Sequence, residues 1–309
     1  MPLQSSIINR ISINAVSGKG ISALIILLLL MSVTLLQNSM AQNVEMPSKG
    51  FCAHRGAMTS HPENTIPAFE QSIASGAQMI EFDVQFSRDS ALIIMHDGTL
   101  DRTTNGSGEV ALMDSKEIRS LDAGSWKDEA FAGTKVPVLR EVLEMMPDNI
   151  WLNVHLKGGY ALGKKVAALI LEMDKTHQAV MAVMEDAAKG ARSVSDQILI
   201  CNMERQSGGL DYVEGTIAMK ADFIQLKGPI TPEFQNYTKS LHKKGIGINY
   251  FGTDDPVIFK QLFDFGIEFP LVNDIVTAMQ YADDFGIKPV VPSYSTPKKH
   301  PIKKIVDKY

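Results

Sequence analysis

Short apolar runs of the kind that form β-strands alternate with stretches of helical periodicity along most of this chain. Such alternation indicates βαβ units and a parallel sheet. The runs are almost continuously apolar, as expected for strands that are buried on both faces. The expected strands are Phe51–Ala53, Met79–Val84, Leu92–Met95, Ile150–Leu156, Ala179–Val183, Ile198–Asn202, Phe223–Leu226, Ile246–Tyr250 and Phe269–Val272. The expected helices are Thr65–Ser75, Ala161–Met173, Asp186–Val194, Leu210–Met219, Pro232–Lys243, Asp255–Phe265 and Val276–Phe285.

This pattern predicts an α/β fold, an imperfect (β/α)8 TIM barrel formed by residues 42–288. Nine expected strands are one too many for a regular barrel, and the link from Val84 to Leu92 is too short for a helical crossover. We therefore expect one helix to be missing early in the barrel. A Gly-, Ser-, Thr- and Asp-rich stretch then spans about residues 98–137 without a long periodic element, which predicts a small inserted subdomain after an early strand.

Residues 1–41 have the three parts of a secretory signal peptide. Arg10 and Lys19 are the only charges before the uncharged, mostly aliphatic run Ile21–Leu36, and Ser39-Met40-Ala41 resembles a cleavage site. The alternative is an uncleaved anchor helix, but the aliphatic run is shorter than the roughly 20 residues that span a bilayer. We expect cleavage near Ala41 and an exported protein, periplasmic or extracellular.

Charge and cysteine content limit the classes of partner. The 309 residues carry a net charge of −5, without the basic surplus of a nucleic-acid-binding protein. Cys52 and Cys201 are too few for a disulfide scaffold, and we expect two buried free thiols. Residues 289–309 form a basic, proline-rich tail, expected to be a solvated strap or disordered end, with weak contact to an anionic membrane surface as the alternative.

Polar side chains gather at the ends of the first three expected strands. His54 and Arg55 end the first, Glu81 and Asp83 lie on one face of the second, and His96 follows the third. Reactive groups at the carboxyl ends of barrel strands converge on one mouth. Two carboxylates beside Arg and His suit a divalent cation that holds an anionic substrate, with the imidazoles moving protons.

Six ordered motifs strengthen this interpretation. From Phe51 to about Lys157 the chain carries, in order, AHRG, HPENTIPAF, EFDVQFSRD, LIIMHDGTLDRTTNGSG, LDAGSW and VPVL. Within Gly245–Asp274 it also carries INYFGTDD and PLVND. Together they resemble the glycerophosphodiester phosphodiesterase family, which shares an imperfect TIM barrel with phosphatidylinositol-specific phospholipases C.

The resemblance implies a role for each matched residue. His54 would be the general base or nucleophile-activating group, and His96 the general acid that protonates the departing alcohol. Glu81 and Asp83 would hold a divalent metal ion, Mg²⁺ or Ca²⁺ by resemblance, and Arg55 would bind a phosphate oxygen. The insertion would shape the glycerol side of the pocket. From the sequence alone, Asn64 is also a plausible N-cap of the next helix.

One position departs from the family pattern. The fourth strand of the family usually carries Asn-x-Glu-x-Lys, whereas here Asn153, His155 and Lys157 share one strand face. We expect His155 to be the third metal ligand and Lys157 to face the phosphate. An imidazole in place of a carboxylate favours Mn²⁺ or Zn²⁺ over Ca²⁺ or Mg²⁺. His155 could instead transfer protons, or metal binding could be lost.

These expectations together describe a metal-dependent phosphodiesterase. It would hydrolyse small glycerophosphodiesters to sn-glycerol 3-phosphate and an alcohol such as choline or ethanolamine, by histidine general acid–base catalysis. One alternative is a related phospholipase-C-like or lysophospholipase-D-type enzyme for another head group. The other is a catalytically silent barrel that binds phosphodiesters or a partner protein.

Overall fold

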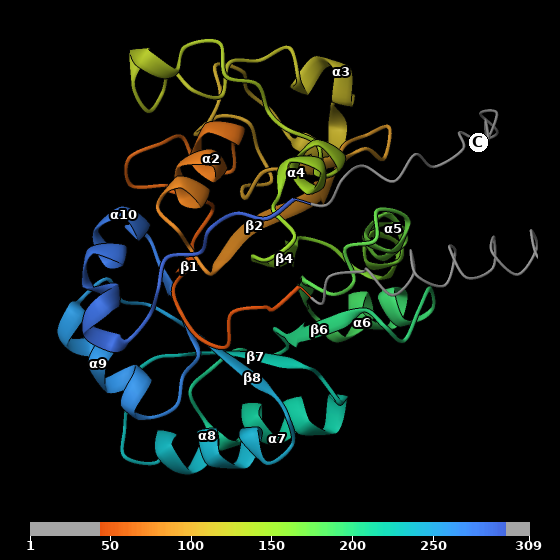
Figure 1. The fold of residues 1–309 in the computed structure, drawn as a ribbon. Helices are drawn as coiled ribbons and strands as arrows, with labels where there is room; N and C mark the ends of the chain where they lie inside the picture. Colours follow the sequence, from red (N-terminus) through yellow and green to blue (C-terminus); the bar gives the residue numbers. More distant parts are fainter. Residues whose placement is uncertain (1–43, 295–309) are drawn as a thin grey trace, which may run out of the picture. The chain divides into compact units, whose positions relative to one another are not determined.

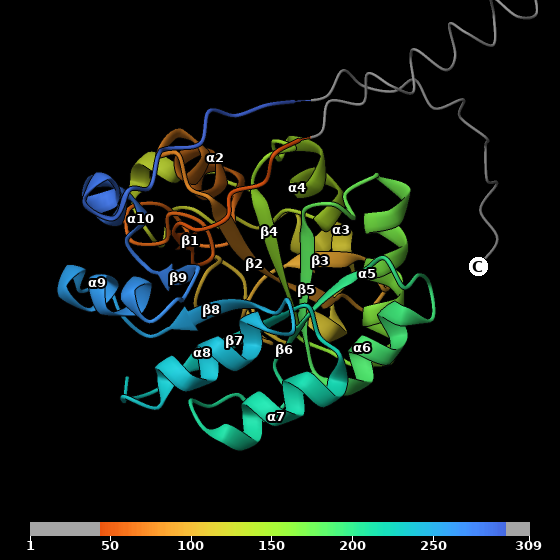
Figure 2. The ribbon, with the colours of Figure 1, turned by 60° about the horizontal axis from the view of Figure 1, so that its bottom comes forward.

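A closed barrel of eight parallel strands organises the protein (Figures 1 and 2). The computed structural model describes residues 44–294. The strands pair in the order β1-β9-β8-β7-β6-β5-β4-β2, and a β1–β2 pairing closes the ring. Their bounds are β1 (Cys52–Ala53), β2 (Met79–Phe86), β4 (Trp151–Leu156), β5 (Ala179–Val183), β6 (Leu199–Asn202), β7 (Phe223–Lys227), β8 (Gly247–Phe251) and β9 (Phe269–Val272). The predicted TIM-barrel class is confirmed.

One of the nine predicted strands does not belong to the parallel ring. This strand, β3 (Leu92–Ile94), pairs antiparallel with β2, so it forms a hairpin outside the ring. The hairpin turns the chain back, and the backbone N–H of Met95 donates to the carbonyl of Asp83. His96 therefore lies beside the carboxyl-terminal half of β2 because β3 runs antiparallel to β2. His96 does not follow the carboxyl end of a parallel barrel strand.

Helices follow most barrel strands and surround the ring in Figure 2. The helical elements of the barrel are α2 (Ile66–Ala74), α4 (Leu139–Met145), α5 (Tyr160–Glu172), α6 (Glu185–Arg192), α7 (Leu210–Met219), α8 (Phe234–His242), α9 (Pro256–Asp264), α10 (Ile275–Ala278) and the 3-10 helix η3 (Met279–Phe285). Two differences from the sequence prediction stand out. The expected helix Val276–Phe285 is divided between α10 and η3, and α4 lies where no helix was expected.

Two layers of apolar side chains hold the barrel. The larger layer lies between strands and helices and includes Phe51 and Phe69, both fully buried. A second cluster contains Met79, Cys52 and Cys201. Full burial of each large apolar side chain contributes about 1.5–3 kcal/mol. Both cysteines are buried free thiols, as predicted, and burial raises the pKa of each.

The segment between β3 and α4 packs around a small core of its own. It contains the short elements η1 (Val110–Leu112), α3 (Ser115–Ile118) and η2 (Glu129–Phe131). Leu100, Val110 and Ile118 are fully buried in one cluster with Ile93 of the hairpin. The inserted chain is thus tied to the barrel through the β2–β3 hairpin, next to the strand that carries Glu81 and Asp83.

The last described residues cross the amino-terminal side of the barrel. Val290 N–H donates to the carbonyl of Gly76, and Asp148 N–H donates to that of Ser293. Residues 289–294 of the expected tail are therefore hydrogen-bonded to the barrel, and residues 295–309 lie outside the described part. The predicted signal peptide, residues 1–41, also lies outside it.

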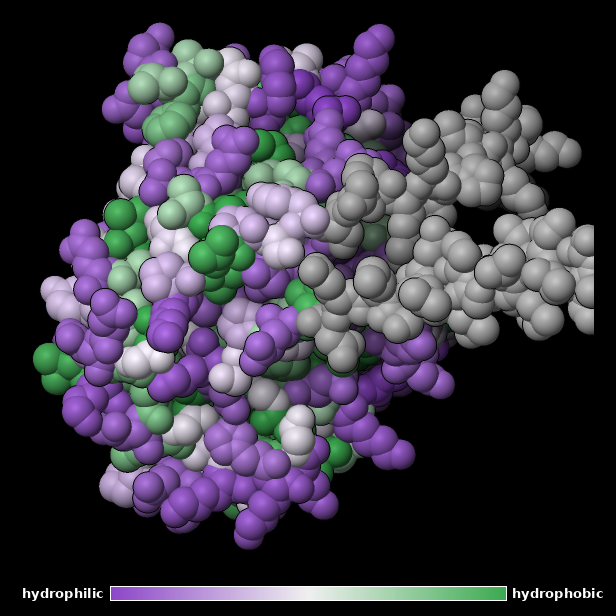
Figure 3. Space-filling model, viewed as in Figure 1, coloured by the Kyte–Doolittle hydropathy of each residue, from purple (hydrophilic) through white to green (hydrophobic). Residues whose placement is uncertain are grey.

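The described surface is mainly hydrophilic on the face shown in Figure 3, where hydrophobic residues form small separate groups. Among residues 44–294, no helix is both long enough and apolar enough to cross a bilayer.

Candidate active site

Two carboxylates and one imidazole meet on adjacent strands. Glu81 and Asp83 are two residues apart on β2, so both side chains point to the same face, and both are almost completely buried. Parallel pairing of β2 with β4 places His155 directly opposite Asp83. One ligand atom from each of the three residues lies within 4.8 Å of the others.

Each carboxylate has one oxygen held by a neighbouring donor and one directed at His155. Oε2 of Glu81 accepts the Arg55 backbone N–H at 2.8 Å, and Oδ2 of Asp83 accepts Asn64 Nδ2 at 2.9 Å. The other oxygens, Glu81 Oε1 and Asp83 Oδ1, lie 3.6 and 3.2 Å from His155 Nδ1. Lys157 Nζ lies 3.1 Å from the same Asp83 oxygen.

This donor set fits a divalent metal ion. It offers two carboxylate oxygens and one imidazole nitrogen, and the supporting hydrogen bonds orient the carboxylates as the second shell of a metal site does. The single nitrogen ligand suits Mn²⁺ or Zn²⁺ as well as the harder Mg²⁺ and Ca²⁺. Glu81, Asp83 and His155 are therefore the residues of the described chain that would hold the metal.

In the protein alone, the cations next to Asp83 compensate its burial. Burial by itself would raise the pKa of Asp83, but the hydrogen bond and charge of His155 and the charge of Lys157 outweigh this effect and lower it. Burial would likewise lower the pKa of His155, yet Asp83 and Glu81 raise it. The cluster thus favours the ionised form of Asp83, the form that binds a cation.

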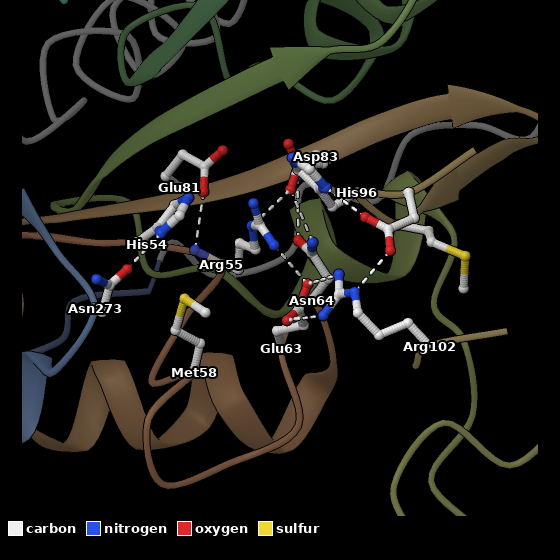
Figure 4. A network of polar contacts seen from close by, with 12 residues as sticks. His54, Arg55, Met58, Glu63, Asn64, Glu81, Asp83, His96, Arg102 and Asn273 are labelled. Atoms are coloured by element: carbon white, nitrogen blue, oxygen red, sulfur yellow. Dashed lines mark hydrogen bonds and ion pairs between the residues drawn. The ribbon is translucent and has the colours of Figure 1, made fainter. Parts of the chain in front are cut away.

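His54 and His96 lie on either side of the carboxylate pair (Figure 4). Nδ1 of His54 is 2.7 Å from Asn273 Oδ1, and Nδ1 of His96 is 2.7 Å from Asp97 Oδ1. In both rings the hydrogen-bonding partner holds Nδ1. Nε2 is therefore the nitrogen available for proton transfer.

A left-handed turn after β1 places Arg55. Arg55 and Gly56 have φ angles of +53° and +77°, and a Cβ on Gly56 would lie 2.9 Å from backbone atoms of Ala68. A non-glycine residue in this conformation costs of order 1–3 kcal/mol and is typical of functional sites. Here the turn directs the Arg55 backbone N–H at Glu81.

Arginine side chains join the insertion to the barrel through Glu63. Arg55 Nη1 lies 2.8 Å from Glu63 Oε1, and Arg102 of the insertion donates to both Glu63 oxygens at 2.7 and 2.8 Å (Figure 4). Arg102 also donates to Asp97 at 2.6 Å and holds the pKa of that carboxyl at about 2. The partner of His96 is thereby fixed in place by the insertion.

An open cleft of about 140 Å³ runs between these groups. Its walls combine the polar cluster with apolar and amide side chains from β6 to β9. The lining residues are His54, Arg55, Glu81, His96, His155, Met203, Gln206, Gln225, Phe251 and Leu271. Of the seven site residues predicted from the sequence, five line the cleft, and Asp83 and Lys157 contact His155, which lines it.

The structure corrects the expectation for Asn64. Thr65 occupies the N-cap position of α2, and Asn64 instead exchanges hydrogen bonds with both the side chain and the backbone N–H of Asp83. Its φ of +58° is left-handed, unlike the extended conformation typical of an N-cap residue. Sequence reasoning also gave no role to Arg102 or Asn273, although both lie in motifs that carried the family resemblance.

Comparisons with known proteins agree with this geometry. Residues 54–204 match the model of the glycerophosphoryl diester phosphodiesterase family. A glycerophosphodiester phosphodiesterase of Caldanaerobacter subterraneus is 47% identical over 111 residues, which cover 36% of this chain and 46% of that protein. One of Bacillus subtilis is 47% identical over 100 residues, which cover 30% and 34%. The chain thus spans less than half the length of these curated relatives.

Solved structures extend the likeness to the whole barrel. The crystal structure of a glycerophosphodiester phosphodiesterase from Agrobacterium tumefaciens has a TM-score of 0.65 and 28% identity, covering 75% of this chain and 99% of the other. An Oleispira antarctica phosphodiesterase in complex with its product sn-glycerol-3-phosphate shares the fold with a TM-score of 0.64 and 23% identity, covering 76% and 96%. Residues 54–204 thus match the glycerophosphodiester phosphodiesterase family in sequence, and the barrel is similar in fold to solved members of that family.

Proposed function

We propose that the protein is a metal-dependent phosphodiesterase that hydrolyses glycerophosphodiesters to sn-glycerol 3-phosphate and an alcohol. One observation carries the proposal. His54 and His96 flank the Glu81–Asp83 pair on one cleft, so two proton-transfer groups lie on either side of a cation-binding cluster. The match of residues 54–204 to the family and the names of the relatives support the same substrate class.

Positive charge in the cleft would bind the phosphodiester, which carries one negative charge. Arg55 lines the cleft, and its planar fork suits phosphate oxygens. Lys157 adds a second cation beside Asp83. When bound by Glu81, Asp83 and His155, a divalent metal would supply Lewis-acid stabilisation of the charge that builds up on the phosphoryl oxygens.

The two histidines would divide the proton transfers. Nε2 of His54 would accept a proton from the attacking group, either water or the glycerol 2-hydroxyl. Nε2 of His96 would donate a proton to the departing alkoxide, a poor leaving group when unprotonated. Imidazoles perform both steps near neutral pH, and each step contributes roughly 10²–10⁴-fold to the rate.

Product analysis over several head groups tests this function. Purified protein is incubated with glycerophosphocholine, glycerophosphoethanolamine, a lysophospholipid and a phosphoinositide, each with Mg²⁺, Ca²⁺, Mn²⁺ or Zn²⁺. We expect sn-glycerol 3-phosphate and the free alcohol from the glycerophosphodiesters. Preferential cleavage of a lysophospholipid or phosphoinositide would instead indicate a related phosphodiesterase. Binding without turnover of any substrate would indicate a silent barrel and contradict the proposal.

We also propose that the chain is exported, on the support of residues 1–41 of the sequence alone. Fractionation of expressing cells followed by N-terminal sequencing tests this. The expected mature chain begins at Gln42, outside the cytoplasm. A cytoplasmic protein that keeps its first residues would contradict export.

A further inference from the structure

The carboxylate of Asp254, which follows β8, holds the side chain of Asn273, and Asn273 faces His54. Asn273 follows β9 and Asp254 follows β8, and these two strands pair in parallel, so their carboxyl ends are neighbours. Asp254 Oδ1 accepts the backbone N–H of Asn273 at 2.7 Å and that of Asp274 at 3.1 Å. Asp254 Oδ2 accepts Asn273 Nδ2 at 3.0 Å.

These contacts decide which end of the Asn273 amide faces the histidine. An ionised carboxylate only accepts hydrogen bonds, so the amide must present its NH₂ group to Asp254. Oδ1 is then directed at His54, where it lies 2.7 Å from Nδ1 (Figure 4). Because an amide oxygen only accepts, Nδ1 of His54 must be the protonated nitrogen.

Packing fixes the orientation of the His54 ring. The Phe251 ring meets it edge-on, with centroids 5.2 Å apart and an interplanar angle of 66°. The backbone N–H of His54 donates to the carbonyl of Val272, and Thr59 Oγ1 donates to that of Asn273 at 3.0 Å. The ring therefore has a fixed plane as well as a fixed hydrogen-bonding partner.

We propose that Asp254 and Asn273 are positioning residues that hold His54 in its Nδ1–H tautomer. In that tautomer the lone pair of the neutral ring is on Nε2, the nitrogen that must accept a proton. Asp254 acts only through Asn273. The effect on catalysis rests on the proposed function, whereas the effect on the tautomer does not.

Replacing one carboxylate oxygen by an NH₂ group should invert the tautomer. In Asp254→Asn, the new amide can still accept the two backbone N–H groups through its oxygen, which directs its NH₂ group at Asn273. Asn273 must then rotate to accept, and it presents its own NH₂ group to His54. Nδ1 becomes the acceptor, and the proton moves to Nε2.

Exchanging the two side chains should restore the tautomer. In Asp254→Asn/Asn273→Asp, the carboxylate at position 273 accepts both from the amide at position 254 and from His54 Nδ1–H. A merely structural role would not produce this rescue, because the double variant carries two changes and the single variant one. Asp255→Asn is the matched control, since Asp255 caps α9 by accepting Val257 N–H and asparagine also caps well.

Long-range ¹⁵N–¹H correlation spectra of the full chain report the tautomer directly, at a pH where the ring is neutral. The signals of His54 are identified by their loss in His54→Gln. We expect Nδ1–H in the wild type, the control and the double variant, and Nε2–H in Asp254→Asn. An Nε2–H wild type, or a tautomer unchanged by Asp254→Asn, would overturn the proposal. If Asp254→Asn does not fold, Asn273→Ala should give a mixture of tautomers, and an unmixed Nδ1–H ring would overturn it.

Turnover of glycerophosphocholine gives the second readout. We expect kcat to fall roughly 10²–10⁴-fold in Asp254→Asn, the contribution of a general base, with KM little changed, and to recover in the double variant. A wild type that shows the expected tautomers but turns over no substrate would contradict the proposed function and leave the positioning intact. Normal kcat together with an inverted tautomer would remove His54 as the base.

Discussion

Nδ1 of His155 lies 3.2 Å from Oδ1 of Asp83, across a parallel strand pair in which the two residues are direct partners. The same nitrogen faces Glu81 Oε1 at 3.6 Å. An imidazole therefore stands where the family resemblance expects a third carboxylate, and it directs a ligand nitrogen at both acids. This arrangement keeps three possible metal ligands but reduces the negative charge around the ion by one.

His155→Glu should shift metal preference toward Mg²⁺ and Ca²⁺ relative to Mn²⁺ and Zn²⁺, because a hard oxygen and a negative charge replace a borderline nitrogen. Titration calorimetry of the chelator-treated protein with each metal measures the change. His177→Glu, at the amino end of β5, is the matched control and should leave the order of affinities unchanged. An unchanged order in His155→Glu would show that His155 is not a ligand.

Asn64→Gly should weaken metal affinity by about 10–100-fold, the usual effect of losing a group that orients a ligand. Glycine accepts the left-handed backbone of this position, so the substitution removes the amide that holds Asp83 without adding backbone strain. Calorimetry with Mn²⁺ gives the affinity, and thermal unfolding reports any general loss of stability. Wild-type affinity in Asn64→Gly would mean that Asp83 needs no such support.

His54→Ala and His96→Ala should each lower kcat by roughly 10²–10⁴-fold while the protein stays folded, since each removes one proton-transfer group. The rate of sn-glycerol 3-phosphate release measures the loss, and circular dichroism checks the fold. His61→Ala is a suitable control because His61 packs against Phe131 of the insertion and does not line the cleft. A near-normal rate in either variant would remove that histidine from its role.

We expect Glu63 to make the free energy of unfolding decrease at acidic pH. Burial alone would raise its pKa, but Arg102 and Arg55 outweigh burial and lower it. A lowered folded-state pKa contributes stability above the unfolded value of about 4.3, and this contribution is lost as the pH falls through the folded pKa. Glu63→Gln should therefore cost about 2 kcal/mol at neutral pH and flatten the acid dependence.

Urea unfolding midpoints between neutral pH and the acid range test this expectation. Glu70→Gln, an exposed change on α2, is the matched control. If wild-type protein and Glu63→Gln lost stability in parallel below about pH 4.3, the Glu63–arginine network would not be the cause.

Most of the barrel could be predicted because local pattern decides its elements. The bounds of β5, β9 and α7 agree with the sequence prediction, since an apolar run or a helical period defines each element. α4 could not be predicted in this way, because two helical turns give too few repeats for a period. The antiparallel direction of β3 was not predicted, although the link from Val84 to Leu92, too short for a parallel crossover, was a signal for it.

The site residues also divide into those that local sequence pattern predicts and those that it does not. Glu81 and Asp83 could be grouped from strand periodicity, because residues two apart on a strand share a face. His155 was assigned to the same site only through the family resemblance. The contact of Asn273 with His54 depends on barrel closure between β9 and β1, which joins opposite ends of the chain. The contact of Arg102 with Glu63 depends on how the insertion folds back onto the barrel. Neither follows from local pattern.

The most direct test of metal-dependent hydrolysis is the rate at which chelator-treated protein releases sn-glycerol 3-phosphate from glycerophosphocholine, before and after a divalent metal is added back. We predict that chelation abolishes release and that at least one of Mn²⁺, Zn²⁺, Mg²⁺ and Ca²⁺ restores it. We also predict that Glu81→Gln stays inactive with every metal. Release that is unaffected by chelation, or absent with all four metals, would contradict the account.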